Sequence, residues 1–144
     1  MTRWLETIGA VSPTDWYTAF LGFLAVLFLL LIVEHTRKHL GFQAYISRKI
    51  VHIITGLIIC YVAVMIHSNI PILLIAFLYI FADLWAMRMG LFKSIHTNSA
   101  SYGTVFYGIS VFVLAIVFWG TFKPIFIITN LIMVIPDALA ALIG

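Results

Sequence analysis

The sequence predicts an all-α fold, a polytopic membrane helix bundle of about five transmembrane helices, and three observations lead to this class. Hydrophobic residues make up 64% of the 144 residues, charged residues make up 9%, and the mean hydropathy is +1.16. So few polar residues cannot cover the surface of a small soluble domain, whereas a bilayer accepts an apolar outer face. The apolar residues also form long runs between short polar loops, as transmembrane helices do.

The first span is expected to follow a polar N-terminal lead over residues 1–15, with residues 16–144 forming a single transmembrane helical domain. The apolar run 16–33 lacks the basic start and small-residue cleavage site of a signal peptide and is long enough to cross a bilayer. Pro13 predicts that its helix begins at Thr14 or Asp15. Gly41 predicts a turn after this span, and we expect residues 42–49 to lie along the membrane interface.

Four further spans are predicted, at residues 50–66, 70–87, 103–119 and 125–143, with a turn at Gly120 and Lys123-Pro124 between the last two. Pro71 falls in the first turn of the third span, where its missing N–H group costs nothing. Pro136 removes a hydrogen bond inside the fifth span and predicts a break, with a new half-helix whose positive end favours anions.

Loop charge predicts the orientation of these spans. Six of the eight lysines and arginines fall in the loops after the first and third spans, which the positive-inside rule places in the cytoplasm. The N-terminus is then outside, and the chain is a multi-pass integral membrane protein, of the inner or plasma membrane if it is bacterial. The net charge of +3 does not indicate a nucleic-acid partner, because the cations cluster at the ends of the spans.

A basic pair followed by a histidine marks the candidate site. Arg48 and Lys49 stand at the mouth of the second span, and in a helix Arg48 and His52 lie on one face together with Thr55 and Gly56. A histidine one turn inside a span must be hydrogen-bonded or lie on a wet cavity. The alternative is that the cations only anchor the helix at the headgroups.

The acidic residues converge on the same predicted side. Glu34, Asp83 and Asp137 fall at or near the cytoplasmic ends of the first, third and fifth spans. Asp137 is the hardest to explain by packing, because an unpartnered carboxylate within a span costs about 2.5 to 3.5 kcal/mol. Glu34 lies so close to water that solvation alone can explain it. Asp83 can be explained by an ion pair with Arg88.

Four short motifs resemble those of one enzyme family in order and position: Arg48-Lys49-Ile50-Val51-His52 with Gly56, Asp83-Leu84-Trp85 with Arg88, Ser101-Tyr102-Gly103-Thr104-Val105-Phe106-Tyr107, and the stretch from Asp137-Ala138 to Gly144. Over residues 45–144 the chain resembles the CTP-dependent lipid alcohol kinases, which include phytol kinase, dolichol kinase and the CTP-using diacylglycerol kinase. The phosphatidate cytidylyltransferases are distant relatives of that family.

The resemblance implies a membrane enzyme that transfers a phosphoryl group from a nucleotide, CTP, to the hydroxyl of a lipid or isoprenoid alcohol. It assigns Mg²⁺ to Asp137 and Asp83, and the nucleotide to Arg48, Lys49 and Gly144. His52 would orient a phosphate or accept the alcohol proton. The partners implied are the nucleotide triphosphate, the alcohol and membrane lipids, with self-association left open.

The family continues beyond the glycine that corresponds to Gly144, so we expect an incomplete version of a larger bundle, inactive alone or completed by another subunit. The alternatives are a non-catalytic scaffold or transporter subunit, or a cytidylyltransferase-like enzyme that acts on a lipid phosphate. The predicted outer halves of the spans are almost wholly apolar, which argues against an ion path across the bilayer.

Overall fold

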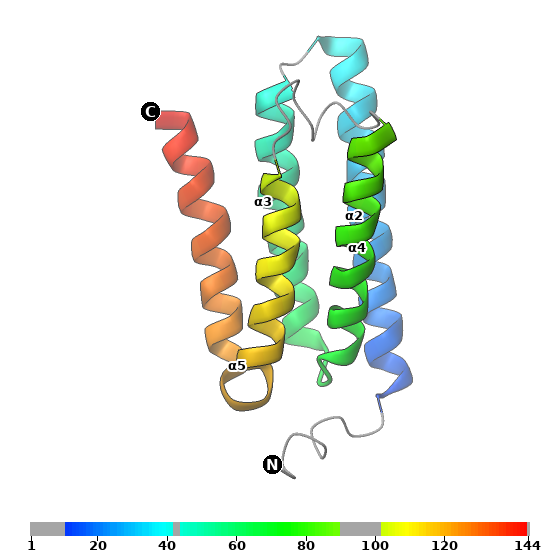
Figure 1. Cartoon of the computed structure of the whole chain (residues 1–144), viewed down its shortest axis with the longest axis vertical. Coiled ribbons are helices and arrows are strands. Elements are labelled where there is room, and N and C mark those ends of the chain that lie inside the picture. Colours follow the sequence, from blue (N-terminus) through cyan, green and yellow to red (C-terminus); the bar gives the residue numbers. More distant parts are fainter. Residues whose placement is uncertain (1–10, 42–43, 90–101, 144) are drawn as a thin grey trace.

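The computed structural model describes residues 11–41, 44–89 and 102–143, and these residues form four long helices without a strand. The helices are α2 (Pro13–Leu40), α3 (Ala44–Met65), α4 (Ile70–Met89) and α5 (Gly103–Ile143) (Figure 1). Within this part of the chain, four segments are long and apolar enough to cross a membrane, and Phe122–Pro136 forms a shorter apolar helix. The prediction of an all-α, multi-pass bundle is confirmed at this level, and its orientation stays a prediction.

Helix α2 has well-defined ends. Ser12 is the N-cap, its hydroxyl accepts a hydrogen bond from the backbone N–H of Thr14 at 3.3 Å, and Pro13 opens the first turn. At the other end Gly41 adopts φ 68°, and its N–H donates to the carbonyl of Arg37 at 3.1 Å. The helix therefore takes in the last residues of the predicted polar lead.

Helix α3 begins earlier than predicted. It runs unbroken from Ala44 to Met65, so the prediction of an interfacial segment is wrong for residues 44–49. These six residues contain neither glycine nor proline, and nothing in them stops the helix from extending past the polar mouth of the span. Arg48 and Lys49 consequently sit on the first turns of a regular helix.

Helix α5 is bent between the predicted fourth and fifth spans, so the turn predicted there is confirmed. Phe122 leaves the helical conformation, with φ −145° and ψ 60°, and divides the helix into two arms that run side by side in Figure 1. Pro124 follows the bend closely, in keeping with the hydrogen bond that proline removes and the clash of its ring with the preceding turn. The backbone stays helical through Pro136, whose fixed φ fits a helix, so the predicted break there is wrong.

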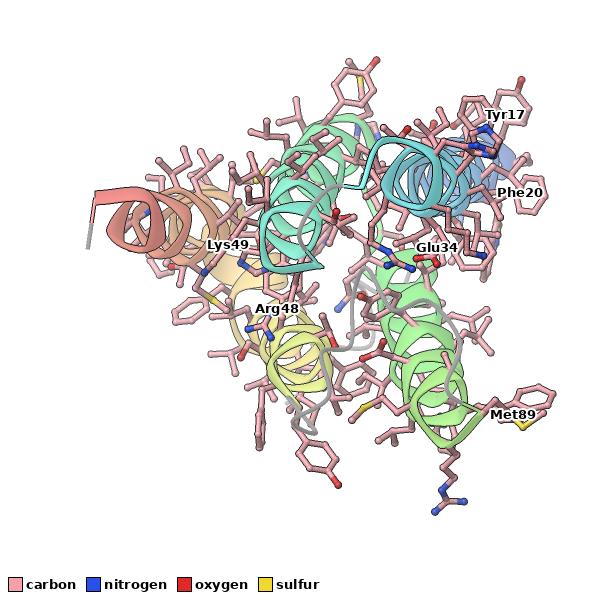
Figure 2. The ribbon with its side chains drawn as sticks, turned by 90° about the horizontal axis from the view of Figure 1, so that it is seen from above. Tyr17, Phe20, Glu34, Arg48, Lys49 and Met89 are labelled. Carbon is pink, nitrogen blue, oxygen red and sulfur yellow. The ribbon has the colours of Figure 1, made fainter. Side chains whose placement is uncertain are left out.

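Helix α3 lies between α2 and the second arm of α5 (Figure 2). The first arm of α5 and α4 pack together and complete the bundle. Apolar side chains also cover the outside: Tyr17 and Phe20 point away from the bundle, as Figure 2 shows, and are 65% and 56% exposed. Such an outer face suits lipid rather than water.

One close approach fixes the distance between α3 and the second arm of α5. A Cβ atom added to Gly56 would overlap the Cγ2 atom of Val134, a side chain that is completely buried. Small residues at helix contacts let backbones come close in membranes, where packing drives association. The lack of a side chain at Gly56 therefore allows α3 and the second arm of α5 to pack closely.

At the end opposite Arg48, a cluster that we call the turn clasp joins three segments. The carboxylate of Asp15, at the start of α2, accepts hydrogen bonds from the backbone N–H groups of His67 and Ser68, the latter at 2.9 Å. Trp119 donates from Nε1 to the carbonyl of His67 at 2.9 Å, and Lys123 donates to the carbonyl of Ile66. The clasp ties the start of α2 and the bend of α5 to the turn between α3 and α4.

The predicted orientation can be tested with one matched pair of cysteines. His67, at the turn clasp, and His39, near the C-terminal end of α2, both have exposed side chains. We expect His67→Cys to react with a membrane-impermeant maleimide on intact cells and His39→Cys to react only after lysis. The native Cys60 is buried and serves as the unlabelled background. Reversed labelling would place the N-terminus inside.

Candidate functional site

A cavity of about 340 Å³ opens where α3 and α5 begin, at the end of the bundle seen in Figure 2. Arg48 and Lys49 lie on the side of α3 that faces α5 in this view. The residues that line the cavity are Arg48, Lys49, His52, Gly103, Thr104, Phe106, Tyr107, Ser110 and Met133. The predicted basic pair and the predicted histidine are thus brought together around one space.

The helical register of α3 explains this grouping. Residues four apart lie on the same face of a helix, so Arg48 and His52 point to the same side, and Lys49 flanks them. The ring of His52 meets the ring of Tyr107 edge to face, with centroids 4.6 Å apart. Tyr107 belongs to the first arm of α5, so a side chain from another helix sets the position of the imidazole.

A buried polar network holds Tyr107 in turn. Its hydroxyl donates to Oδ1 of Asn130 at 2.8 Å, and Nδ2 of Asn130 donates to the carbonyl of Gly56 and to Sγ of Cys60, both at 3.1 Å. Asn130 is 0% exposed and lies on the second arm of α5. The network therefore joins α3 to both arms of α5 directly behind His52.

The sequence interpretation passed over Asn130. A signal was available, because an amide in the middle of an apolar span must find hydrogen-bonding partners or lie on a functional site. What the sequence did not contain was the identity of those partners, which lie on α3 and on the other arm of α5.

Asp83 is connected to the cavity through a hydrogen bond with Thr104. Its carboxylate is buried at the end of α4 and accepts a hydrogen bond from Oγ1 of Thr104 at 2.6 Å. Thr104 lines the cavity, whereas Asp83 is not part of the lining. The carboxylate therefore lies one side chain away from the space beside Arg48.

Glu34 has a structural role that differs from the solvation expected for it. Its carboxylate is buried and lies 2.6 Å from Nη2 of Arg37 and 3.6 Å from Nζ of Lys38, both on the same helix. Pairs three and four residues apart on a helix meet in this way. Glu34 helps to hold two of the cations predicted to set the orientation.

Two predicted site residues lie outside what the structure describes. The backbone of Asp137 continues the second arm of α5, but its side chain is not among the described ones, and neither is any part of Gly144. Among the described side chains, no three histidine, cysteine or acidic residues are grouped closely enough to hold a metal ion. The predicted metal ligands therefore stay a prediction.

A second cavity lies deeper in the bundle and is apolar. It has a volume of about 70 Å³, and residues of all four helices line it. A narrow space of about 10 Å³ between the two cavities shares Thr55, Tyr79 and Tyr107 with the apolar one, and Arg48, His52, Thr104 and Tyr107 with the charged one. Charged and apolar spaces thus follow one another along α3.

This arrangement suits an anion attached to, or placed beside, a hydrocarbon chain. A guanidinium, an ammonium and an imidazole line the outer cavity, and such groups bind phosphate oxygens. The inner cavity offers hydrocarbon surface.

Comparison of the chain with protein-family models, with curated proteins and with solved structures finds no match.

Proposed function

We propose that this chain forms a membrane-embedded kinase site that transfers a phosphoryl group from a nucleotide, CTP, to the hydroxyl of a lipid or isoprenoid alcohol. The observation that supports it is the succession of two cavities along α3, one lined by Arg48, Lys49 and His52 and the next by apolar side chains. A phosphoryl donor needs the first environment and a lipid alcohol needs the second. The four motifs that resemble the CTP-dependent lipid alcohol kinases support the same proposal.

Each described residue has a role in this proposal that follows from its chemistry. The planar guanidinium of Arg48 binds two phosphate oxygens at once, and Lys49 adds a compact positive charge. Phosphoryl transfer depends mainly on positioning and on neutralising charge, which these two cations provide. His52, placed by Tyr107, orients a phosphate or accepts the proton of the alcohol.

The acidic residues are suited to Mg²⁺, which proteins bind with one or two carboxylates while substrate phosphates and waters complete the octahedron. Asp137 and Asp83 would supply those carboxylates, and the buried carboxylate of Asp83 already lies one side chain from the cavity. When bound, Mg²⁺ would neutralise charge on the phosphate oxygens. Thr104 holds the carboxylate of Asp83 in a fixed orientation through its hydrogen bond.

The proposal is tested by incubating the complete protein, with any subunit that completes its site, in mixed micelles with CTP, Mg²⁺ and a set of long-chain alcohols. We expect CDP and alcohol phosphates as products. Release of pyrophosphate with a lipid phosphate as substrate would identify a cytidylyltransferase instead, and no nucleotide chemistry with any of these substrates would support a scaffold.

Asp137→Asn provides the sharpest variant for this assay. Asparagine keeps the size of the side chain but removes its charge, so we expect phosphorylation to fall by about 100-fold or more, because even partners of metal ligands cost 10- to 100-fold when removed. The melting temperature without nucleotide should stay near that of the wild type. Equal activity in the variant would remove Asp137 from the mechanism.

A further inference from the structure

Two histidines stand one turn apart near the C-terminal end of α2. His35 and His39 are four residues apart, so they lie on the same face of the helix, and both side chains are exposed. Their rings are close to each other, with centroids 4.3 Å apart and planes tilted by 47°. Neither residue lines any of the cavities described above, so the pair is separate from the candidate kinase site.

The spacing of the two rings suits two ligands of one metal ion. An imidazole nitrogen binds a zinc-sized ion at about 2.0 to 2.1 Å, which places the ion roughly 3.2 Å from the centroid of the ring. Two rings bound at a right angle then have centroids roughly 4.5 Å apart, and two rings bound at a tetrahedral angle roughly 5.2 Å. The observed 4.3 Å is closest to the right angle of square-planar and octahedral ions. Histidines four residues apart on a helix are also an established arrangement for holding one zinc ion.

The surroundings of the pair favour a bound cation. The carboxylate of Glu34 lies 2.6 Å from Nη2 of Arg37 and 3.6 Å from Nζ of Lys38, and it offsets part of the positive charge beside the histidines. The C-terminal end of a helix carries a partial negative charge that stabilises cations within its last turn, and α2 ends at Leu40. The cap at Gly41 fixes this end of the helix, so the two histidines keep their spacing.

We propose that His35 and His39 together bind one divalent late transition-metal ion on the surface of the bundle, Cu²⁺ most tightly, with water in the remaining coordination positions. Imidazole suits Cu²⁺, Ni²⁺ and Zn²⁺, whereas Mg²⁺ and Ca²⁺ prefer oxygen ligands, and Cu²⁺ forms the strongest complexes of the divalent series. The ion joins two successive turns at the end of α2 and so stabilises the folded helix. This site does not depend on the kinase function proposed above.

Titration with Cu²⁺ tests this site directly. The full chain, freed of metal, is reconstituted in phosphatidylcholine nanodiscs and titrated with Cu²⁺, with empty nanodiscs as the blank. Pulsed electron paramagnetic resonance counts the imidazole nitrogens bound to the ion. We expect one bound ion per chain with two imidazole ligands, and a rise in melting temperature when the ion binds. Mg²⁺ in about 100-fold excess should not displace it.

Each histidine can be tested against matched controls. His35→Gln and His39→Gln should each leave one imidazole on the ion and weaken Cu²⁺ binding by about tenfold or more, because even the outer partners of metal ligands contribute about 10- to 100-fold. His67→Gln, at a histidine 94% exposed at the opposite end of the bundle, should bind as the wild type does. Thr36→His combined with His39→Thr keeps the composition but makes the two histidines direct neighbours, which do not face each other on a helix. This variant should bind as weakly as the single variants.

Three results would overturn the proposal. The first is a single imidazole nitrogen on the ion in the wild type, and the second is unchanged Cu²⁺ affinity in His35→Gln, in His39→Gln or in the variant with neighbouring histidines. The third is loss of Cu²⁺ binding in His67→Gln, which would place the site at the turn clasp. Melting temperatures without metal show whether each variant folds, and the nitrogen count in the wild type decides the question even where a variant does not.

Discussion

Replacing Arg48 by glutamine is expected to abolish the stabilisation that, under the proposed function, CTP with Mg²⁺ gives to the complete protein, while expression and membrane insertion stay intact. Glutamine keeps a long polar side chain at the membrane surface but cannot form the charged, two-pronged contact with phosphate. A ligand at 100 times its Kd stabilises the folded state by about 2.7 kcal/mol, which is readily measured as a rise in melting temperature. Melting curves of both proteins with and without CTP and Mg²⁺ provide the test.

Arg88 offers the matched control. It is an exposed arginine at the same end of the bundle and is not part of the lining of the cavity. Arg88→Gln should keep the full response to CTP, because it changes the net charge by the same amount at a side chain that does not line the cavity. Loss of the response to CTP in both variants would show that Arg48 acts only through the net positive charge of this end of the bundle. Loss of expression in Arg48→Gln would support the interpretation of Arg48 as a membrane anchor.

Replacing Asn130 by leucine is expected to destabilise the bundle by about 2 kcal/mol. The change removes the acceptor of the Tyr107 hydroxyl and the donor to the carbonyl of Gly56. Each unsatisfied buried group costs about 1 to 3 kcal/mol in soluble proteins, while hydrogen bonds between membrane helices average about 0.6 kcal/mol. Because hydrogen bonds between membrane helices contribute less, we expect a loss of about 2 kcal/mol rather than the full cost of two unsatisfied groups. The loss in unfolding free energy can be measured by unfolding both proteins in a denaturing detergent.

A double-mutant cycle isolates the hydrogen bond between the two side chains. Tyr107→Phe removes only the hydroxyl, so the effects of Tyr107→Phe and Asn130→Leu should be less than additive when combined. Ile132→Ala, at a side chain 60% exposed on the same arm, controls for general effects on α5. Strict additivity would show that the hydrogen bond carries no energy of its own.

The helices could be predicted from composition and periodicity, because a membrane span is recognisable as a run of consecutive apolar residues. These patterns placed the turn between the fourth and fifth spans, where the chain bends at Phe122, but they did not place every helix end. The polar residues before Ile50 suggested an interfacial segment, yet α3 extends through them, and α5 continues through Pro136, where a break was predicted. Hydropathy reports where lipid is tolerated, whereas the end of a helix depends on local backbone conformation.

The grouping of Arg48, Lys49 and His52 was predictable because it depends on one helix. The partners of these residues were not predictable, since Asp83 and Thr104 are 21 residues apart on two helices, and Tyr107 and Asn130 lie on two arms of a bent one. Contacts of this kind depend on how the helices are rotated against each other. The sequence specifies those rotations only through the complete packing of the bundle, as at Gly56 and Val134.

The position of the turn clasp has a mechanical consequence. Asp15, Trp119 and Lys123 fasten three segments to each other at one end of the bundle, and the charged cavity opens at the other end. Helices of about 20 residues are about 30 Å long, so a tilt of about 2° at the clasp moves their far ends by about 1 Å. Because the clasp restrains one end of these helices, a given change in their tilt would displace the mouth of the cavity near Arg48 more than any point close to the clasp.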